Sequence, residues 1–93
     1  MSVAYVCLLN KLIPTDLTYK DVKRLLNKDP LELFEFIKDL VEDQFGYVKR
    51  VKIHDCNVWR GSITVEYFAY TEYSRIPVRI ICASDSAELF IEV

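Results

Sequence analysis

The sequence predicts an α+β fold, a mostly antiparallel sheet with two helices packed on one of its faces, in the order β-α-α-β-β-β-β. Two observations carry this prediction. Apolar residues recur with a helical period between residues 19 and 46, and from residue 47 onward they alternate with polar ones. The helical segment also has a broad apolar face, which usually covers a sheet. A chain of 93 residues is expected to form one domain, residues 1–93.

The first strand is expected over residues 2–9, SVAYVCLL. Nearly every residue in it is apolar, and several are β-branched or aromatic. Such a run is typical of a strand that is central and buried on both faces. Asn10, Lys11 and Pro14 are expected to end it.

Two helices are expected next. Thr18 and Asp21 have the spacing of a capping box, which predicts a helix over residues 19–26. Asp29 and Glu32 repeat that spacing, Pro30 suits a first helical position and Gly46 suits a left-handed stop, so residues 29–46 form the second helix. Its apolar face comprises Leu33, Phe34, Ile37, Leu40, Val41 and Phe45.

Four more strands are expected after residue 46. Residues 47–53, 62–70, 78–82 and 87–93 alternate between apolar and polar side chains. Pro77 has no backbone donor, so the strand that it opens should begin at an edge or a bulge. The first turn has two interpretations, one at Asp55-Cys56-Asn57 and one at Arg60-Gly61.

The composition indicates a particular cellular setting. The three cysteines are far apart, and the sequence begins without a basic leader, which predicts a cytoplasmic protein with reduced thiols; the sequence does not decide whether any of the three pairs. The apolar run near the N-terminus is too short to cross a membrane. Low Gln and Asn content among many charged and β-branched residues resembles small proteins of thermophilic archaea and their viruses.

The face of the sheet away from the helices is expected to be apolar as well. Because several exposed aromatics on one sheet face leave burial unused, a second copy of the chain is the expected cover, and a curled sheet within one chain is the alternative. The predicted interface residues are Phe68, Tyr70, Ile81 and Phe90.

Charge is segregated along the chain. Residues 1–28 and 47–60 each carry a net charge of +3, and residues 29–46 carry −5, within an overall net charge of −2. If the first helix and second strand share a side, basic side chains would gather beside aromatics, as single-stranded nucleic acid binding requires. The candidates are Lys20, Lys23, Arg24, Lys49, Arg50, Lys52, Trp59 and Arg60. A solvated polar face, or contact with the acidic helix of another subunit, would use the same charges.

The sequence gives little support for a catalytic, metal or cofactor site. His54 and Cys56 are two residues apart, so on a regular strand they would point the same way, as a Cys–His dyad needs. No phosphate-binding glycine loop, nucleophile elbow or zinc-ligand spacing accompanies them. We therefore expect neither catalytic residues nor a metal or cofactor.

The sequence as a whole favours a small non-enzymatic protein that binds another macromolecule and acts as a homodimer. The alternative is a nucleic-acid-binding protein that uses the basic residues around Lys49, Arg50 and Lys52. A Cys–His enzyme is the least favoured interpretation. The strand order and the identity of a partner do not follow from the sequence.

Overall fold

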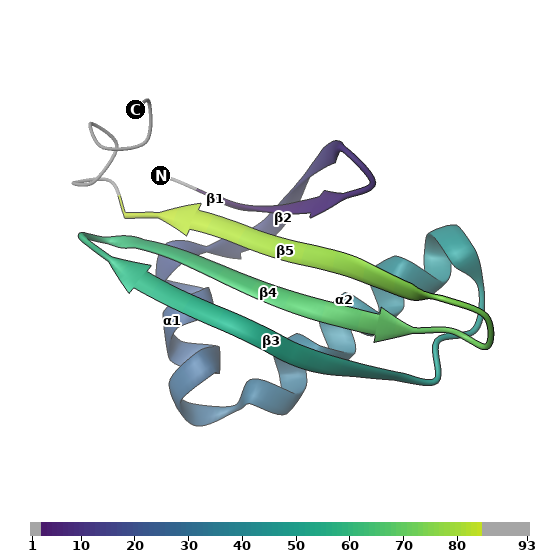
Figure 1. Cartoon of the computed structure of the whole chain (residues 1–93). Coiled ribbons are helices and arrows are strands. Elements are labelled where there is room, and N and C mark those ends of the chain that lie inside the picture. The colour runs from purple at the N-terminus through teal and green to yellow at the C-terminus, as the bar shows by residue number, and fades with distance from the viewer. Residues whose placement is uncertain (1–2, 85–93) are drawn as a thin grey trace.

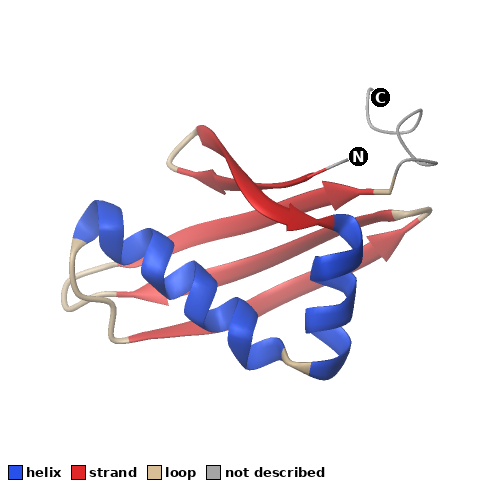
Figure 2. Cartoon of the chain, turned by 180° about the vertical axis from the view of Figure 1, so that it is seen from behind, coloured by secondary structure: helices blue, strands red, loops and turns tan. Residues whose placement is uncertain are grey.

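The computed structural model describes residues 3–84 and places a five-stranded antiparallel sheet against two helices. The elements are β1 (Val3–Leu8), β2 (Lys11–Thr18), α1 (Tyr19–Lys28), α2 (Pro30–Phe45), β3 (Arg50–Trp59), β4 (Ser62–Tyr70) and β5 (Arg75–Ala83). The strands lie in the order β2-β1-β5-β4-β3. Figure 1 views the sheet from the face without helices, and Figure 2 shows both helices across the other face. The predicted α+β class and the antiparallel sheet are confirmed.

The predicted element order needs one correction. Both helices follow the second strand, because β1 and β2 form a hairpin through Leu9 and Asn10. Residues 11–18 look unlike a strand, since they contain Pro14 and Asp16. Their position explains the exception, because β2 is an edge strand, where a proline removes no ladder hydrogen bond. The strand predicted over residues 87–93 lies outside the described residues.

Strand β1 is central, as predicted, but it is buried on one face only. Ala4, Val6 and Leu8 are buried under the helices, whereas Tyr5 is 39% exposed on the other face. The apolar character of this strand therefore extends onto a surface that nothing in the described chain covers.

The helices begin and end close to the predicted residues. The capping box of α1 forms as expected, with the Asp21 N–H donating to Thr18 Oγ1 at 3.2 Å and the Thr18 N–H donating to Asp21 Oδ2 at 3.0 Å. These bonds, led by the backbone donor of Thr18, lower the pKa of Asp21. The second predicted box, at Asp29, does not form. Asp29 also ends α1, donating its N–H to the Leu25 carbonyl, and its own carbonyl accepts from the Glu32 N–H.

The core lies between the helices and one face of the sheet. Its fully buried members include Leu33, Ile37 and Val41 from α2. The ring of Tyr67, on β4, packs edge to face against Phe34 at 5.5 Å. Burial raises the pKa of Tyr67 to about 12 and that of Cys82 to about 11. The loop after α2 is fixed by the Val48 N–H, which donates to Glu42 Oε2 at 2.9 Å.

Two turns and one bulge set the register of the other strands. Arg60 and Gly61 have φ values of 50° and 81°, so they form the two-residue hairpin, and residues 55–57 continue β3. Between Ile53 and Asp55 the register shifts, which leaves His54 as the extra residue of a bulge. On the side of β5 that faces β1, the last paired residues are Val78 and Leu8. Pro77 lies one residue beyond this pair, so the N–H that it lacks would have had no partner strand, as expected for an edge position.

Candidate functional site

The face of the sheet opposite the helices, which we call the open face, is the main unoccupied surface of the described chain. Its side chains are the residues that alternate with the buried ones on β4 and β5. Because paired residues of neighbouring strands share a face, the register arranges them in rows across the sheet. One row is Arg75, Tyr70 and Arg50, and the next is Pro77, Phe68 and Lys52.

Cationic and aromatic side chains are in direct contact in these two rows. The guanidinium of Arg75 lies 4.3 Å from the centre of the Phe68 ring, and that of Arg50 lies 4.9 Å from the centre of the Tyr70 ring. Each contact is a cation–π interaction, in which the guanidinium is attracted to the face of the ring. We call Arg50, Lys52, Phe68, Tyr70 and Arg75 the arginine–aromatic cluster.

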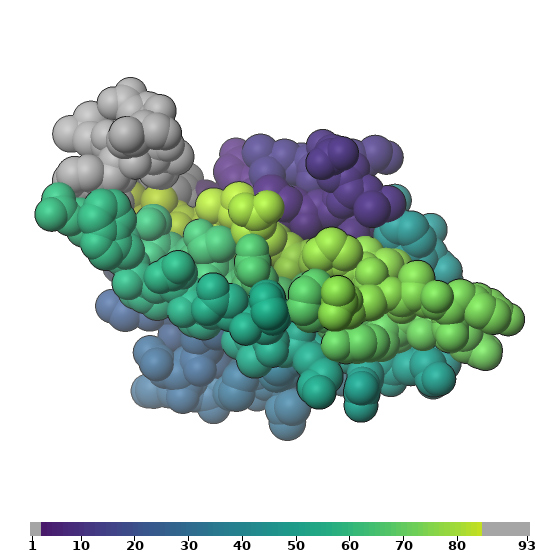
Figure 3. Space-filling view, viewed as in Figure 1, coloured from purple at the N-terminus to yellow at the C-terminus, as the bar shows by residue number. Residues whose placement is uncertain are grey.

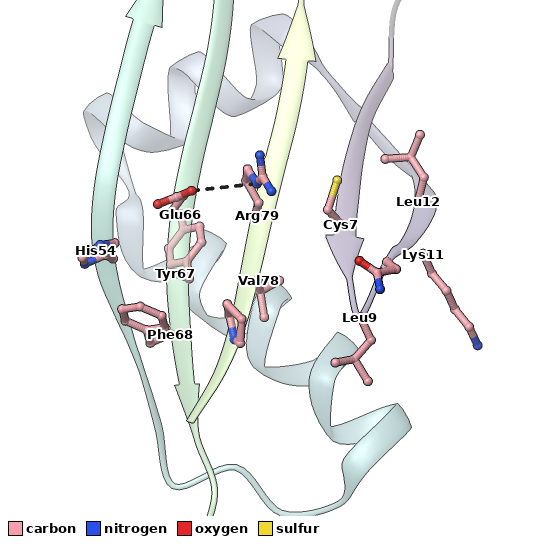
Figure 4. A pocket seen from close by; sticks show the side chains of 12 residues that line it. Cys7, Leu9, Lys11, Leu12, His54, Glu66, Tyr67, Phe68, Val78 and Arg79 are labelled. Carbon is pink, nitrogen blue, oxygen red and sulfur yellow. Dashed lines mark ion pairs between the residues drawn. The ribbon is translucent and has the colours of Figure 1, made fainter. Parts of the chain in front are cut away.

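A shallow hollow of about 600 Å³ adjoins this cluster. Figure 4 shows its two sides, with Phe68, Glu66 and His54 on β3 and β4 and with Cys7, Leu9 and Lys11 on the β1–β2 hairpin. The imidazole of His54 lies 4.7 Å from the Phe68 ring. Arg79 Nε lies 3.9 Å from Glu66 Oε2 on the floor, and both side chains remain about half exposed. In the surface view, the hairpin stands along one side of the open face (Figure 3).

Leu9 at the tip of this hairpin has a φ of 50°, a conformation that leucine rarely adopts. Its side chain is 59% exposed and lines the hollow. Backbone strain of this kind is concentrated at functional sites, so the strained hairpin tip is a second indication that the surface around the hollow is functional.

More aromatic rings lie at the end of the sheet next to the cluster. Tyr47 and Tyr73 are 69% and 95% exposed. Together with Phe45 they line a second hollow of about 350 Å³ formed by residues that flank the turn after Tyr70. The described chain therefore exposes aromatic rings on both sides of the turn at which the arginine–aromatic cluster ends.

The two layers of the molecule differ in charge. On β3, β4 and β5, the open face carries Arg50, Lys52, Arg75 and Arg79 against two carboxylates, Glu66 and Asp55. Helix α2, in the other layer, has a single basic residue, Lys38, among Glu32, Glu35, Asp39, Glu42 and Asp43. A chain that is acidic overall thus presents a net positive surface on the side that its helices leave uncovered.

The structure divides the basic residues expected to bind nucleic acid between both layers. Arg50 and Lys52 belong to the arginine–aromatic cluster, and Lys49 is an exposed residue that directly precedes β3. Trp59 and Arg60 lie at the far end of β3, with the guanidinium 4.9 Å from the indole centre. Lys20, Lys23 and Arg24 lie on α1 in the helical layer and do not join them. Arg75 and Arg79 were missed, because the sequence shows only an alternating strand there.

The residues expected to form a homodimer interface lie on this same face where they are described. Phe68, Tyr70 and Ile81 are all half-buried on the open face. Part of their burial comes from the cations that cover the two aromatic rings. Phe90 lies outside the described residues.

His54 and Cys56 do not form a dyad. Cys56 pairs with the buried Val65, so its side chain points to the helix side, whereas His54 contacts Phe68 on the open face. The bulge between Ile53 and Asp55 reverses the expected alternation and separates them. Burial, followed by the charge of Asp55, raises the pKa of Cys56, which is the opposite of what an activated thiolate requires.

Other kinds of site have no support in residues 3–84. In this part of the chain no group of three or more His, Cys, Asp or Glu side chains is placed to hold a metal ion. Neither described helix has the length and apolar content needed to cross a membrane. Cys7, Cys56 and Cys82 are free thiols. Comparison of the chain with protein-family models, curated proteins and solved structures found no match.

Proposed function

We propose that this protein is a non-enzymatic macromolecule-binding protein whose open sheet face binds single-stranded nucleic acid. The observation that carries the proposal is the arginine–aromatic cluster, in which cations from β3 and β5 surround two rings on β4. Phosphates are neutralised by such cations, and bases stack on such rings. An unpaired strand is the favoured ligand because bases within a duplex are already stacked on one another.

The hollow beside the cluster supports the same ligand. It is open rather than enclosed, and its exposed polar groups include Lys11 and Arg79. A strand lying from this hollow across Phe68 toward Tyr73 would meet cations and rings along its whole path. Sequence preference is expected to be low, because stacking and phosphate contacts are tolerant of base identity.

Self-association through Phe68, Tyr70 and Ile81 is the other use of the open face. In a face-to-face dimer, the four cations Arg50, Lys52, Arg75 and Arg79 would lie near the same four cations of the second copy. Juxtaposed like charges disfavour such an arrangement. A polyanion is the better electrostatic complement, so we favour nucleic acid as the occupant of this face.

The test is fluorescence anisotropy of a labelled oligothymidylate at low salt with three forms of the protein. The double variant K52Q/R75Q removes two cations beside Phe68, and it should bind at least tenfold more weakly than the wild type. The matched control K20Q/K23Q removes the same charge from α1 and should bind like the wild type. A flat titration with the wild type, or equal losses in both variants, would refute the proposal.

The stacking component has its own test. Phe68→Leu keeps an apolar side chain at this half-buried position but removes the ring. Because stacking contributes roughly 1–3 kcal/mol per base, affinity should fall about 5-fold to 150-fold while the thermal unfolding curve stays close to that of the wild type. Unchanged affinity would mean that the cations act without the ring.

A further inference from the structure

The outer edge of β3 is a second unoccupied surface, distinct from the open face. β3 ends the strand order of the sheet, so one side of its backbone has no partner strand among the described residues. The edge β2 carries Pro14, Asp16 and a register shift, all of which obstruct pairing. β3 carries no proline, and the bulge at His54 interrupts only its first half. The segment Asp55–Trp59 therefore has neither a bulge nor a proline to obstruct pairing.

The hairpin fixes which backbone groups face outward. Because Arg60 and Gly61 form a two-residue turn, Trp59 and Ser62 are a hydrogen-bonded pair. Counting back by twos, Asn57 and Asp55 also direct their backbone groups toward β4. The N–H and C=O groups of Cys56 and Val58 thus point to the free edge, and the Cys56 N–H is held only by the exposed Asp55 Oδ1, at 2.9 Å.

We propose that two copies of this chain pair through their β3 edges, antiparallel, about a twofold axis at Asn57. In this register Val58 of one copy lies opposite Cys56 of the other, and these are the residues whose backbone groups face outward. Both side chains point to the helix side of the sheet, where Val58 is 59% exposed. The pairing therefore places the Val58 side chain of each copy against the Cys56 side chain of the other and covers this exposed apolar surface twice. A shift of the axis by one residue in the N-terminal direction would pair Val58 with the bulge residue His54.

Charge favours the same register. Asp55 lies opposite Trp59 of the second copy, and in each copy the guanidinium of Arg60 lies 4.9 Å from the centre of that indole ring. Each Asp55 carboxylate therefore meets a guanidinium of the second copy on the open-face side, and the twofold axis makes this contact twice. The partner that the edge fits is a second copy of this chain, because only its own sequence supplies both halves of each contact.

Cysteine crosslinking tests the register directly. Residues at the axis form a non-hydrogen-bonded pair with Cα atoms about 4.5 Å apart, within the range that a disulfide spans. In a Cys56→Ser background, Asn57→Cys should form a crosslinked dimer in oxidised glutathione, two thiols giving one disulfide and two reduced glutathiones. Lys52→Cys in the same background is the control, because the proposed register places its two copies on opposite sides of the axis.

Sedimentation without nucleic acid tests the association itself. A ladder of five residues is small, so the wild type should dimerise weakly, with a dissociation constant on the order of micromolar to tens of micromolar. Val58→Lys should be monomeric, whereas Leu12→Lys, at an equally exposed position on β2, should dimerise like the wild type. The proposal is overturned by a wild type that stays monomeric, by equal crosslinking at residues 52 and 57, or by dimers in Val58→Lys.

Discussion

The dependence of nucleic acid affinity on salt follows from the cations of the open face. Arg50, Lys52, Arg75 and Arg79 all project from this side of the sheet. If a single strand contacts all four, the logarithm of affinity falls with the logarithm of salt with a slope of about −2.8. Raising the salt from about 50 to about 200 mM should then weaken binding about 50-fold.

Removing two cations reduces that slope by a known amount. K52Q/R75Q leaves two contacts, so its slope should be about −1.4, and the same rise in salt should weaken its binding only about 7-fold. Anisotropy titrations of one labelled oligonucleotide at several KCl concentrations measure both slopes. If the double variant has the slope of the wild type, the phosphates contact some other surface, and the reasoning from the arginine–aromatic cluster is refuted.

Three further predictions concern the scaffold that presents these surfaces. Leu9→Asn should stabilise the protein by about 1 kcal/mol in urea unfolding, because asparagine suits the left-handed turn position that leucine occupies with strain; a destabilised variant would contradict this. Thr18→Ala should cost about 1 kcal/mol in the same assay, because it removes the acceptor that caps α1, and no loss would mean that the cap contributes nothing. Tyr67 has its pKa raised from 10.0 to about 12, so its stabilising effect is complete below pH 10 and is lost as the pH rises to 12. Relative to Tyr67→Phe, the wild type should lose about 2–3 kcal/mol over that range, and parallel curves for the two proteins would refute the assignment.

Local signals in the sequence predicted the helices well. The spacing of Thr18 and Asp21 located the start of α1, and Pro30 with Gly46 located both ends of α2. The cap at Asp29 was wrong for a reason that no local pattern contains. One residue ends the first helix and begins the second, and its backbone is held by both, so its side chain does not reach the N–H of Glu32.

The strand β2 shows where local reasoning fails. Pro14 and Asp16 would disrupt an interior strand, and only the position of β2 at the sheet edge makes them acceptable. That position depends on pairing with β1, which is a tertiary property. The bulge at His54 is a second case, because a single inserted residue leaves no compositional trace yet reverses the faces of everything after it.

The candidate site was predicted only in part, because it too depends on how the strands pair. Arg50, Lys52, Phe68 and Tyr70 were each singled out, but as members of two different surfaces. Cross-strand register brings them onto one face and adds Arg75, whose contact with Phe68 depends on the pairing of β4 with β5. Conversely, Lys20 and Lys23 share a charge with the cluster but lie on α1, which packs on the other side of the sheet.

The two proposals together make a prediction that neither makes by itself. Pairing of β3 edges would place both open faces on the same side of one continuous sheet, because paired residues share a face. Because the bulge at His54 leaves Lys52 and Asn57 opposite β4 residues that are only four apart, the two copies of Lys52 would then be about eight residues apart along the strand direction, or about 27 Å. An oligonucleotide of about 30 nucleotides is long enough to occupy two sites, whereas one of about 8 nucleotides occupies one.

At protein concentrations where the wild type dimerises, Val58→Lys should therefore bind the long oligonucleotide at least tenfold more weakly and the short one equally well. Equal affinity of both proteins for the long oligonucleotide would show that the two open faces do not act together, even if each binds nucleic acid and the edges pair.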